Sequence, residues 1–91
     1  MRALELPPRL RLIAGWVPEG AYLADVGTDH GYLPTWLRLQ GKIRGAVASD
    51  LRSGPLERAK VTGSLYGTDN IEYRLCNGLA GIRPSEVDTV T

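Results

Sequence analysis

In the first half of the chain, segments with hydrophobic residues at helical spacing alternate with a segment of continuous hydrophobic residues. Apolar residues at helical spacing follow two prolines that suit a helix start, and they predict a helix over residues 8–16. The apolar run at residues 21–26, bounded by glycines, predicts a short buried strand. After a loop, apolar residues at i, i+3 and i+4 with a proline in the first turn predict a second helix over residues 32–40.

The second half continues the same alternation. Residues 43–49 form an apolar run that does not alternate with polar residues, which is typical of a parallel strand covered on both faces and ended here by Asp50. A helix capped by Ser53 and continuing to about residue 66 follows. Residues 71–76 alternate with a period of two, which predicts a half-exposed edge strand. Residues 87–91 begin a fourth strand.

Strands that alternate with helices predict an α/β protein with a parallel sheet. A buried second strand and a half-exposed third strand fit the doubly wound strand order 3-2-1-4, in which the third strand is an edge. We therefore expect a Rossmann-like fold, with the chain forming the N-terminal part of a larger protein. An unpaired fourth strand would leave an open sheet edge, so we also expect this chain to associate with itself.

The overall composition excludes several classes of protein. The chain has 91 residues, of which 43% are hydrophobic and 23% charged, and its formal charge of +1 gives no global footprint of a nucleic-acid binder. No apolar run reaches the roughly 20 residues that span a bilayer, and the N-terminus lacks a signal-peptide core, so we expect a cytoplasmic protein without a membrane partner. The lone Cys76 supports neither a disulfide nor a metal site.

The loop between the first strand and its helix carries the candidate chemistry. Residues 25–31 read DVGTDHG, and the helix start directs backbone N–H groups toward a ligand at the carboxyl end of the strand. In the dinucleotide fingerprint G-x-G-x-x-G the middle position is a glycine that admits pyrophosphate, but here it is Asp29. An aspartate about 4 Å from a phosphate costs on the order of 4 kcal/mol at a dielectric near 20. S-adenosylmethionine has no phosphate, and its ammonium and sulfonium favour nearby carboxylates such as Asp25 and Asp29.

Two later positions fit the same kind of site. Asp50 stands about 20 residues beyond the glycine loop at the tip of the second strand, where Rossmann-like folds bind ribose hydroxyls. The polar segment 77–81 follows the third strand, where a side chain either meets an adenine edge or caps a turn. Arg2, Arg9 and Arg11 are candidates for RNA phosphate contacts, although exposed arginines of this kind are more often a solvated surface, which is the interpretation we favour.

The chain resembles the bacterial tRNA adenine-N1-methyltransferases of the TrmK type over nearly its whole length. The resemblance rests on the runs PPRLRLIAGWVPEG, LADVGTDHGYLPTWL, SGPLERA and RLCNGLAGI, and on the Gly41-Lys42 step. It implies a Rossmann-like, S-adenosylmethionine-dependent enzyme that methylates N1 of adenine twenty-two in tRNA. The family often has Glu where Asp50 stands, and it continues into an A-G-M-G-G string and a C-terminal helical domain that this sequence does not contain.

The resemblance also implies roles for individual residues. Asp25, Gly27, Asp29 and His30 would line the methionine end of the cofactor, Asp50 would bind the ribose, and Asn77 with Gly78 would lie by the adenine. The full set of expected cofactor-binding residues is Asp25, Gly27, Thr28, Asp29, His30, Gly31, Asp50, Leu51, Asn77 and Gly78. Asp29 is also the candidate catalytic residue, because a carboxylate there would relieve the positive charge on the methylated base.

Two other functions stay open on the sequence alone. A Rossmann-like module that binds a nucleotide or a partner protein without chemistry has the same glycine-containing turn. A nicotinamide or flavin enzyme is a third possibility, and Asp29 argues against it because such cofactors carry a pyrophosphate.

Overall fold

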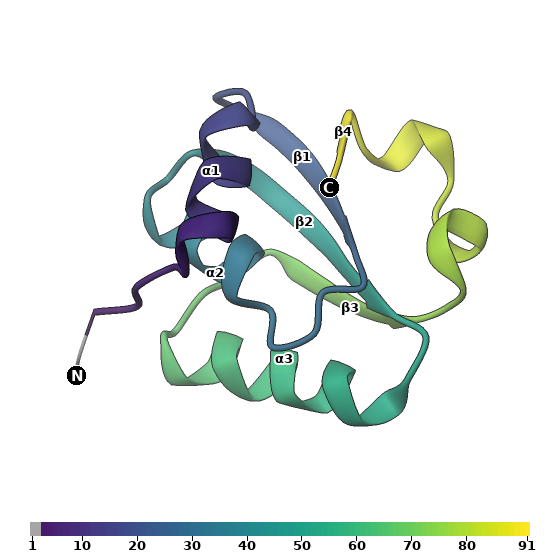
Figure 1. Cartoon of the computed structure of the whole chain (residues 1–91). Coiled ribbons are helices and arrows are strands. Elements are labelled where there is room, and N and C mark those ends of the chain that lie inside the picture. The colour runs from purple at the N-terminus through teal and green to yellow at the C-terminus, as the bar shows by residue number, and fades with distance from the viewer. Residues whose placement is uncertain (1–2) are drawn as a thin grey trace.

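The protein folds around one parallel four-stranded sheet, and the computed structural model describes residues 3–91 (Figure 1). The strands are β1 (Ala21–Val26), β2 (Ile43–Asp50), β3 (Ile71–Leu75) and β4 (Thr89–Val90). The helices are α1 (Pro8–Trp16), α2 (Tyr32–Leu39) and α3 (Ser53–Leu65), and two short 3-10 turns, η1 (Gly78–Gly81) and η2 (Pro84–Glu86), precede β4.

The strand order is β3-β2-β1-β4, as the sequence pattern predicts, and all three pairings are parallel. In the middle of the sheet Leu23 of β1 lies between Ala46 of β2 and Thr89 of β4. Because β1 pairs with a strand on each side, its carboxyl end lies between the ends of β2 and β4. The expected α/β fold with a parallel sheet in the order 3-2-1-4 is thereby confirmed.

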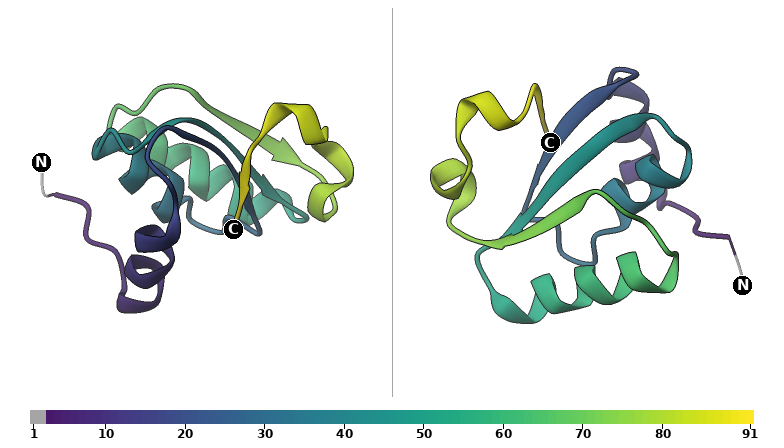
Figure 2. Two further views of the ribbon diagram at one scale, coloured as in Figure 1. Left: turned by 90° about the horizontal axis from the view of Figure 1, so that it is seen from above. Right: turned by 180° about the vertical axis from the view of Figure 1, so that it is seen from behind.

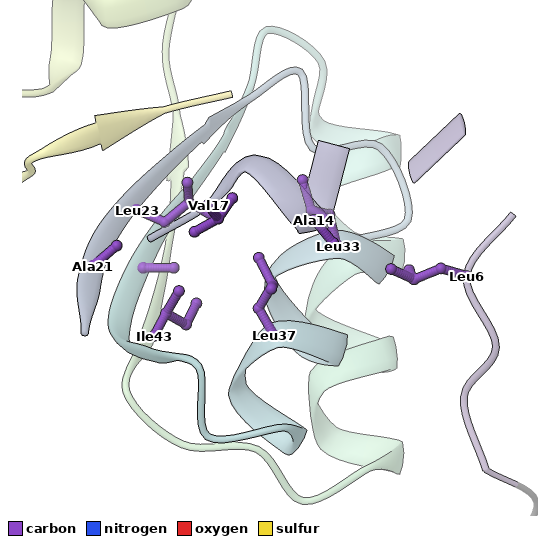
Figure 3. Packing of buried hydrophobic residues seen from close by; sticks show 9 residues of the cluster. Leu6, Ala14, Val17, Ala21, Leu23, Leu33, Leu37 and Ile43 are labelled. Carbon is purple, nitrogen blue, oxygen red and sulfur yellow. The ribbon is translucent and has the colours of Figure 1, made fainter. Parts of the chain in front are cut away.

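All three helices cover the same face of the sheet (Figure 2). The core between them and the sheet is made of small and medium aliphatic side chains, and Leu23 and Leu37 have no exposed surface. Figure 3 shows this cluster, in which α1 and α2 contribute residues that meet β1 and β2. Its buried members are Leu6, Ala14, Val17, Ala21, Leu23, Leu33, Leu37, Ile43 and Ala46.

The opposite face of the sheet has a much smaller cover. Ala24 and Val47 are buried there beneath Ile82, with Tyr22 and Val87 packed beside them. Ile82 and Val87 belong to the segment that contains the two 3-10 turns and returns the chain to β4, whereas Tyr22 belongs to β1. One helical layer and this short segment therefore enclose the sheet.

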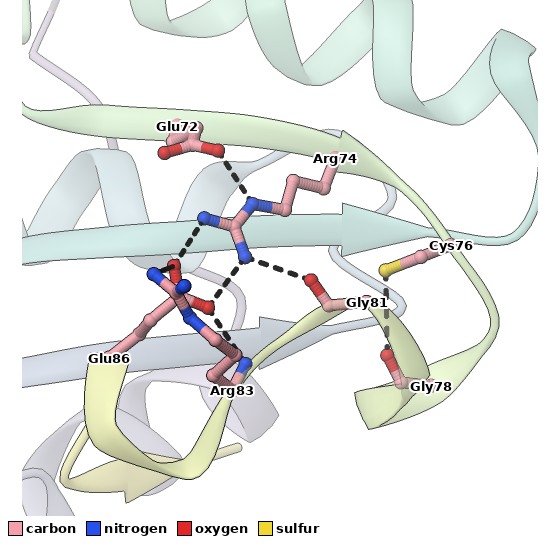
Figure 4. Close-up of polar contacts among 7 residues, drawn as sticks. All are labelled: Glu72, Arg74, Cys76, Gly78, Gly81, Arg83 and Glu86. Atoms are coloured by element: carbon pink, nitrogen blue, oxygen red, sulfur yellow. Dashed lines mark hydrogen bonds and ion pairs between the residues drawn. The ribbon is translucent and has the colours of Figure 1, made fainter.

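The returning segment is held against β3 by an arginine (Figure 4). Arg74 donates hydrogen bonds to both carboxylate oxygens of Glu86, at 2.8 and 2.6 Å, and to the Gly81 carbonyl at 2.8 Å. Its Nε bonds Glu72 at 2.6 Å. The Arg74 bonds to Glu86, together with a bond from the Arg83 N–H, lower the pKa of Glu86 to about 2. A bidentate charged pair of this kind fixes orientation as well as distance.

The element boundaries differ from the sequence prediction by a residue or two. Ser53 does not cap α3 but begins it, because Arg52 stands at the cap position and its N–H donates to the Asp50 carboxylate at 3.0 Å. Asp50 itself belongs to β2 rather than following it. The regular part of β4 is shorter than residues 87–91, although the Thr91 N–H still bonds the Ala24 carbonyl at 2.9 Å.

Candidate functional site

A hollow of about 320 Å³ lies at the carboxyl end of β1. Its floor is the glycine-containing loop, one wall is α1, and Thr91 closes the side next to β4. The lining residues are Pro7, Arg9, Leu10, Ile13, Asp25, Val26, Gly27, Thr28, Asp29, His30, Tyr32, Leu33 and Thr91. Open α/β sheets bind ligands at this place, outside the carboxyl ends of the strands.

Asp25 lies at the bottom of this hollow and is only 7% exposed. One carboxylate oxygen accepts a hydrogen bond from the Thr28 hydroxyl at 2.7 Å, and the other accepts one from the Thr91 hydroxyl at 2.9 Å. Burial raises the pKa of Asp25, and the two hydroxyl bonds lower it in part. Each carboxylate oxygen keeps a further lone pair, so Asp25 can still accept a bond from a ligand.

Asp29 connects the loop to the second strand through its backbone. Its φ is 56°, in the left-handed region that Asp adopts more readily than most residues. Its N–H donates to an Asp50 carboxylate oxygen at 3.2 Å, while the Arg52 N–H holds the other oxygen. Two backbone donors therefore orient the Asp50 carboxylate, whereas the Asp29 side chain is largely exposed and 3.9 Å from Arg58.

Gly31 lets the loop pass close to α3. Its φ is 69°, and it occupies the cap position of α2. A Cβ at this position would lie 2.8 Å from the Ala59 Cβ and 3.0 Å from the Ala59 Cα. Only glycine meets both conditions, so the direction in which α2 leaves the loop depends on it.

His30 lies on the loop at the edge of the hollow, and its ring stacks on Tyr32. The two ring centroids are 5.0 Å apart and the planes differ by 7°. The stacked pair fixes the His30 ring against the start of α2, and both rings line the hollow.

The expected residues fall into two groups. Asp25, Gly27, Thr28, Asp29 and His30 line the hollow, and Gly31 follows them at the helix start. Asp50, Leu51, Asn77 and Gly78 do not line it. They lie at the neighbouring strand ends, where the Cys76 N–H bonds the Asp50 carbonyl at 3.0 Å and thus holds the start of the 77–81 segment beside β2.

The sequence pattern missed the contribution of α1 and of Thr91. Arg9, Leu10 and Ile13 line the hollow. Arg9 is exposed, as expected, and it lies at the hollow as well. Arg11 lies instead at a separate surface hollow beside Trp36 and Lys42, and Arg2 is outside the described residues. The paired prolines mark the start of α1 in the sequence, but they do not indicate that this helix lies against the glycine loop.

Two general properties complete the description of residues 3–91. No helix in this range is both long enough and apolar enough to cross a bilayer. The same residues contain no group of three or more His, Cys, Asp or Glu side chains placed to hold a metal ion.

This arrangement of loop, helix and strand ends is shared with a known family. A family model described as a methyltransferase domain matches residues 6–91. The chain belongs to this family of methyltransferase domains. The match includes every residue that lines the hollow described above.

Individual relatives are also similar to this methyltransferase domain. The tRNA (adenine(22)-N(1))-methyltransferase of Bacillus subtilis is 38% identical over 92 residues, which cover 100% of this chain and 39% of the relative. The crystal structure of the B. subtilis M1A22 tRNA methyltransferase TrmK superposes with a TM-score of 0.91 at 37% identity, covering 97% of this chain and 38% of that one. The structure of M. capricolum TrmK in complex with S-adenosyl-homocysteine superposes with a TM-score of 0.86 at 34% identity. That match covers 93% of this chain and 39% of the other. The chain therefore spans about two fifths of the length of these relatives.

Replacing Gly31 with alanine tests the close approach of the loop to α3. We expect Gly31→Ala to lower the free energy of unfolding by about 2 kcal/mol or more, because a left-handed φ and a backbone overlap add together. Chemical denaturation followed by circular dichroism measures the change.

Gly15→Ala is the matched control. Gly15 lies inside α1, and a Cβ there would meet nothing within 4 Å, so alanine should stabilise the protein by about 0.5–1 kcal/mol. Equal effects of the two substitutions would contradict the packing described for Gly31.

Proposed function

We propose that this methyltransferase domain is the N-terminal, cofactor-binding part of an S-adenosylmethionine-dependent enzyme that methylates N1 of adenine 22 in tRNA, in the cytoplasm. The observation that carries the proposal is the hollow at the carboxyl end of β1, which Asp25 and Asp29 line together with Gly27. Two carboxylates disfavour a pyrophosphate and suit a cationic cofactor. The relatives from B. subtilis and M. capricolum described above support the same assignment.

The residues of the hollow match the chemical groups of the amino-acid part of this cofactor. Asp25 offers lone pairs to an ammonium, and the Thr28 and Thr91 hydroxyls hold that carboxylate in place. Leu10, Ile13 and Leu33 supply apolar surface for the methylene groups. The cofactor, when bound, supplies an activated methyl group, and the protein's main task is to align it with the acceptor nitrogen.

We assign the nucleoside part of the cofactor to the neighbouring strand ends. Asp50 is 4% exposed and its carboxylate is oriented by two backbone N–H groups, which is the arrangement expected for an acceptor of ribose hydroxyl bonds. Leu51 follows it and is 66% exposed, so an apolar surface is available for an adenine face. Asn77 and Gly78 lie at the end of β3, where they would meet the adenine edge.

Two other functions are weaker on this geometry. A nicotinamide or flavin enzyme needs room for pyrophosphate at the position that Asp29 occupies. A module that binds a nucleotide or a partner protein without chemistry is the alternative, because the chain spans only about two fifths of the length of the relatives.

Calorimetry with S-adenosylhomocysteine and with NAD tests the cofactor. We expect the chain to bind the first and not the second, because the loop carboxylates repel a pyrophosphate. Methylation of unmodified tRNA by a longer protein that contains this sequence then separates the enzyme from a binding module. Binding of NAD alone, or no methyl transfer to adenine, would reject the proposal.

Asp29→Asn tests the proposed catalytic role of this carboxylate. Asparagine tolerates the left-handed φ, so the backbone bond to Asp50 should survive while the charge is lost. We expect turnover of tRNA by that longer protein to fall at least about tenfold more than affinity for S-adenosylhomocysteine does.

Arg58→Gln is the control for Asp29, because it removes the neighbouring cation and leaves the carboxylate in place. It should leave turnover within a small factor of the wild type. Equal losses of turnover and cofactor affinity in Asp29→Asn would assign the carboxylate to cofactor binding alone.

We propose that the 91-residue chain also associates with itself through β4. This strand is at the edge of the sheet, and Val90 is 52% exposed. Sedimentation velocity should show the mean mass rising with concentration, and Val90→Lys should reduce the effect because an edge lysine opposes strand pairing. Val61→Lys, on an equally exposed part of α3, should not reduce it, and a monomer at all concentrations would exclude this association.

A further inference from the structure

We propose that Arg9 of α1 binds the carboxylate of the amino-acid part of the cofactor. This inference rests on the proposed function, since it assigns a residue to one group of S-adenosylmethionine. Arg9 lies in α1, before β1 and the glycine loop, and the loop motif does not include it.

The position of Arg9 is the first observation. It lines the same hollow as Asp25, Thr28 and His30, although it comes from the helix that precedes β1. α1 forms a wall of this hollow through Arg9, Leu10 and Ile13. Any group bound above Asp25 therefore has the loop below it and α1 beside it.

The balance of charge in the hollow is the second observation. Asp25 and Asp29 are its acidic groups, and Arg9 is the arginine among its lining residues. The amino-acid part of the cofactor carries an ammonium and a carboxylate. The loop acids favour the ammonium but repel the carboxylate, so a cation elsewhere in the lining would stabilise the carboxylate. A guanidinium meets this need because it binds a carboxylate through two parallel N–H bonds.

The third observation is that the Arg9 guanidinium has no competing partner among residues 3–91. Arg38, Arg44, Arg52, Arg58, Arg74 and Arg83 all form ion pairs there. Arg11 donates to the Leu6 carbonyl at 3.5 Å and lies outside the hollow. Within the described chain, Arg9 is therefore free to bind a ligand without breaking an existing pair.

Binding of two ligands to Arg9→Gln tests the assignment. S-adenosylhomocysteine has the amino-acid part, whereas 5′-methylthioadenosine keeps the nucleoside and the sulfur but lacks it. Calorimetry should show affinity for S-adenosylhomocysteine reduced about 10- to 100-fold in Arg9→Gln, the range expected for a charged hydrogen-bonded pair. Affinity for 5′-methylthioadenosine should stay within about twofold of the wild type. Arg9→Lys should restore part of the lost affinity, because it keeps the charge but not the planar fork.

Arg11→Gln is the matched control on the same helix, and it should leave both affinities unchanged. Equal losses for the two ligands in Arg9→Gln would show a general structural effect and overturn the assignment. Unchanged affinity for S-adenosylhomocysteine with weaker tRNA binding would also overturn it and make Arg9 a phosphate contact. If the wild-type chain binds neither ligand, the proposed function itself fails, which is a distinct result.

Discussion

The buried carboxylate of Asp25 is bonded to Thr91, which is 66 residues away along the chain, as well as to the nearby loop. Thr28 in the glycine loop and Thr91 after β4 each donate a hydroxyl bond to it. Burial makes a charge in this place costly, and the two donors offset part of that cost. The carboxylate is therefore best accommodated when loop and fourth strand are both in position. The hollow exists between these same elements, so its shape depends on this pair of bonds.

Much of the fold could be predicted because local pattern and topology agree. The non-alternating run of β2 and the alternating run of β3 identify a central and an edge strand, and the sheet has them in those positions. The glycines around β1 mark the loop, and five of the expected site residues line the hollow there. Such features depend on neighbours in sequence, which is why a single sequence contains them.

The remaining features depend on contacts between distant segments. Polarity shows that Arg9 is turned away from the core of α1, but not that this side of the helix meets the glycine loop. The pairing of Arg74 with Glu86 likewise requires the path of the returning segment, which no periodicity in residues 76–88 indicates. The start of α3 is different, because the bond between the Asp50 carboxylate and the Arg52 N–H is local, and the sequence pattern missed it by favouring Ser53 as the cap.

Asp29 stands at the position that is a glycine in the dinucleotide fingerprint. The residue keeps the left-handed backbone that glycine would adopt, and its N–H still reaches Asp50. The loop is thereby linked through its backbone to the carboxylate at the end of β2. The difference from that fingerprint is the carboxylate of Asp29, because a glycine at this position would leave room for a pyrophosphate. A carboxylate at this position disfavours a phosphate and favours a cation, and this is the physical basis for the sulfonium cofactor that we propose.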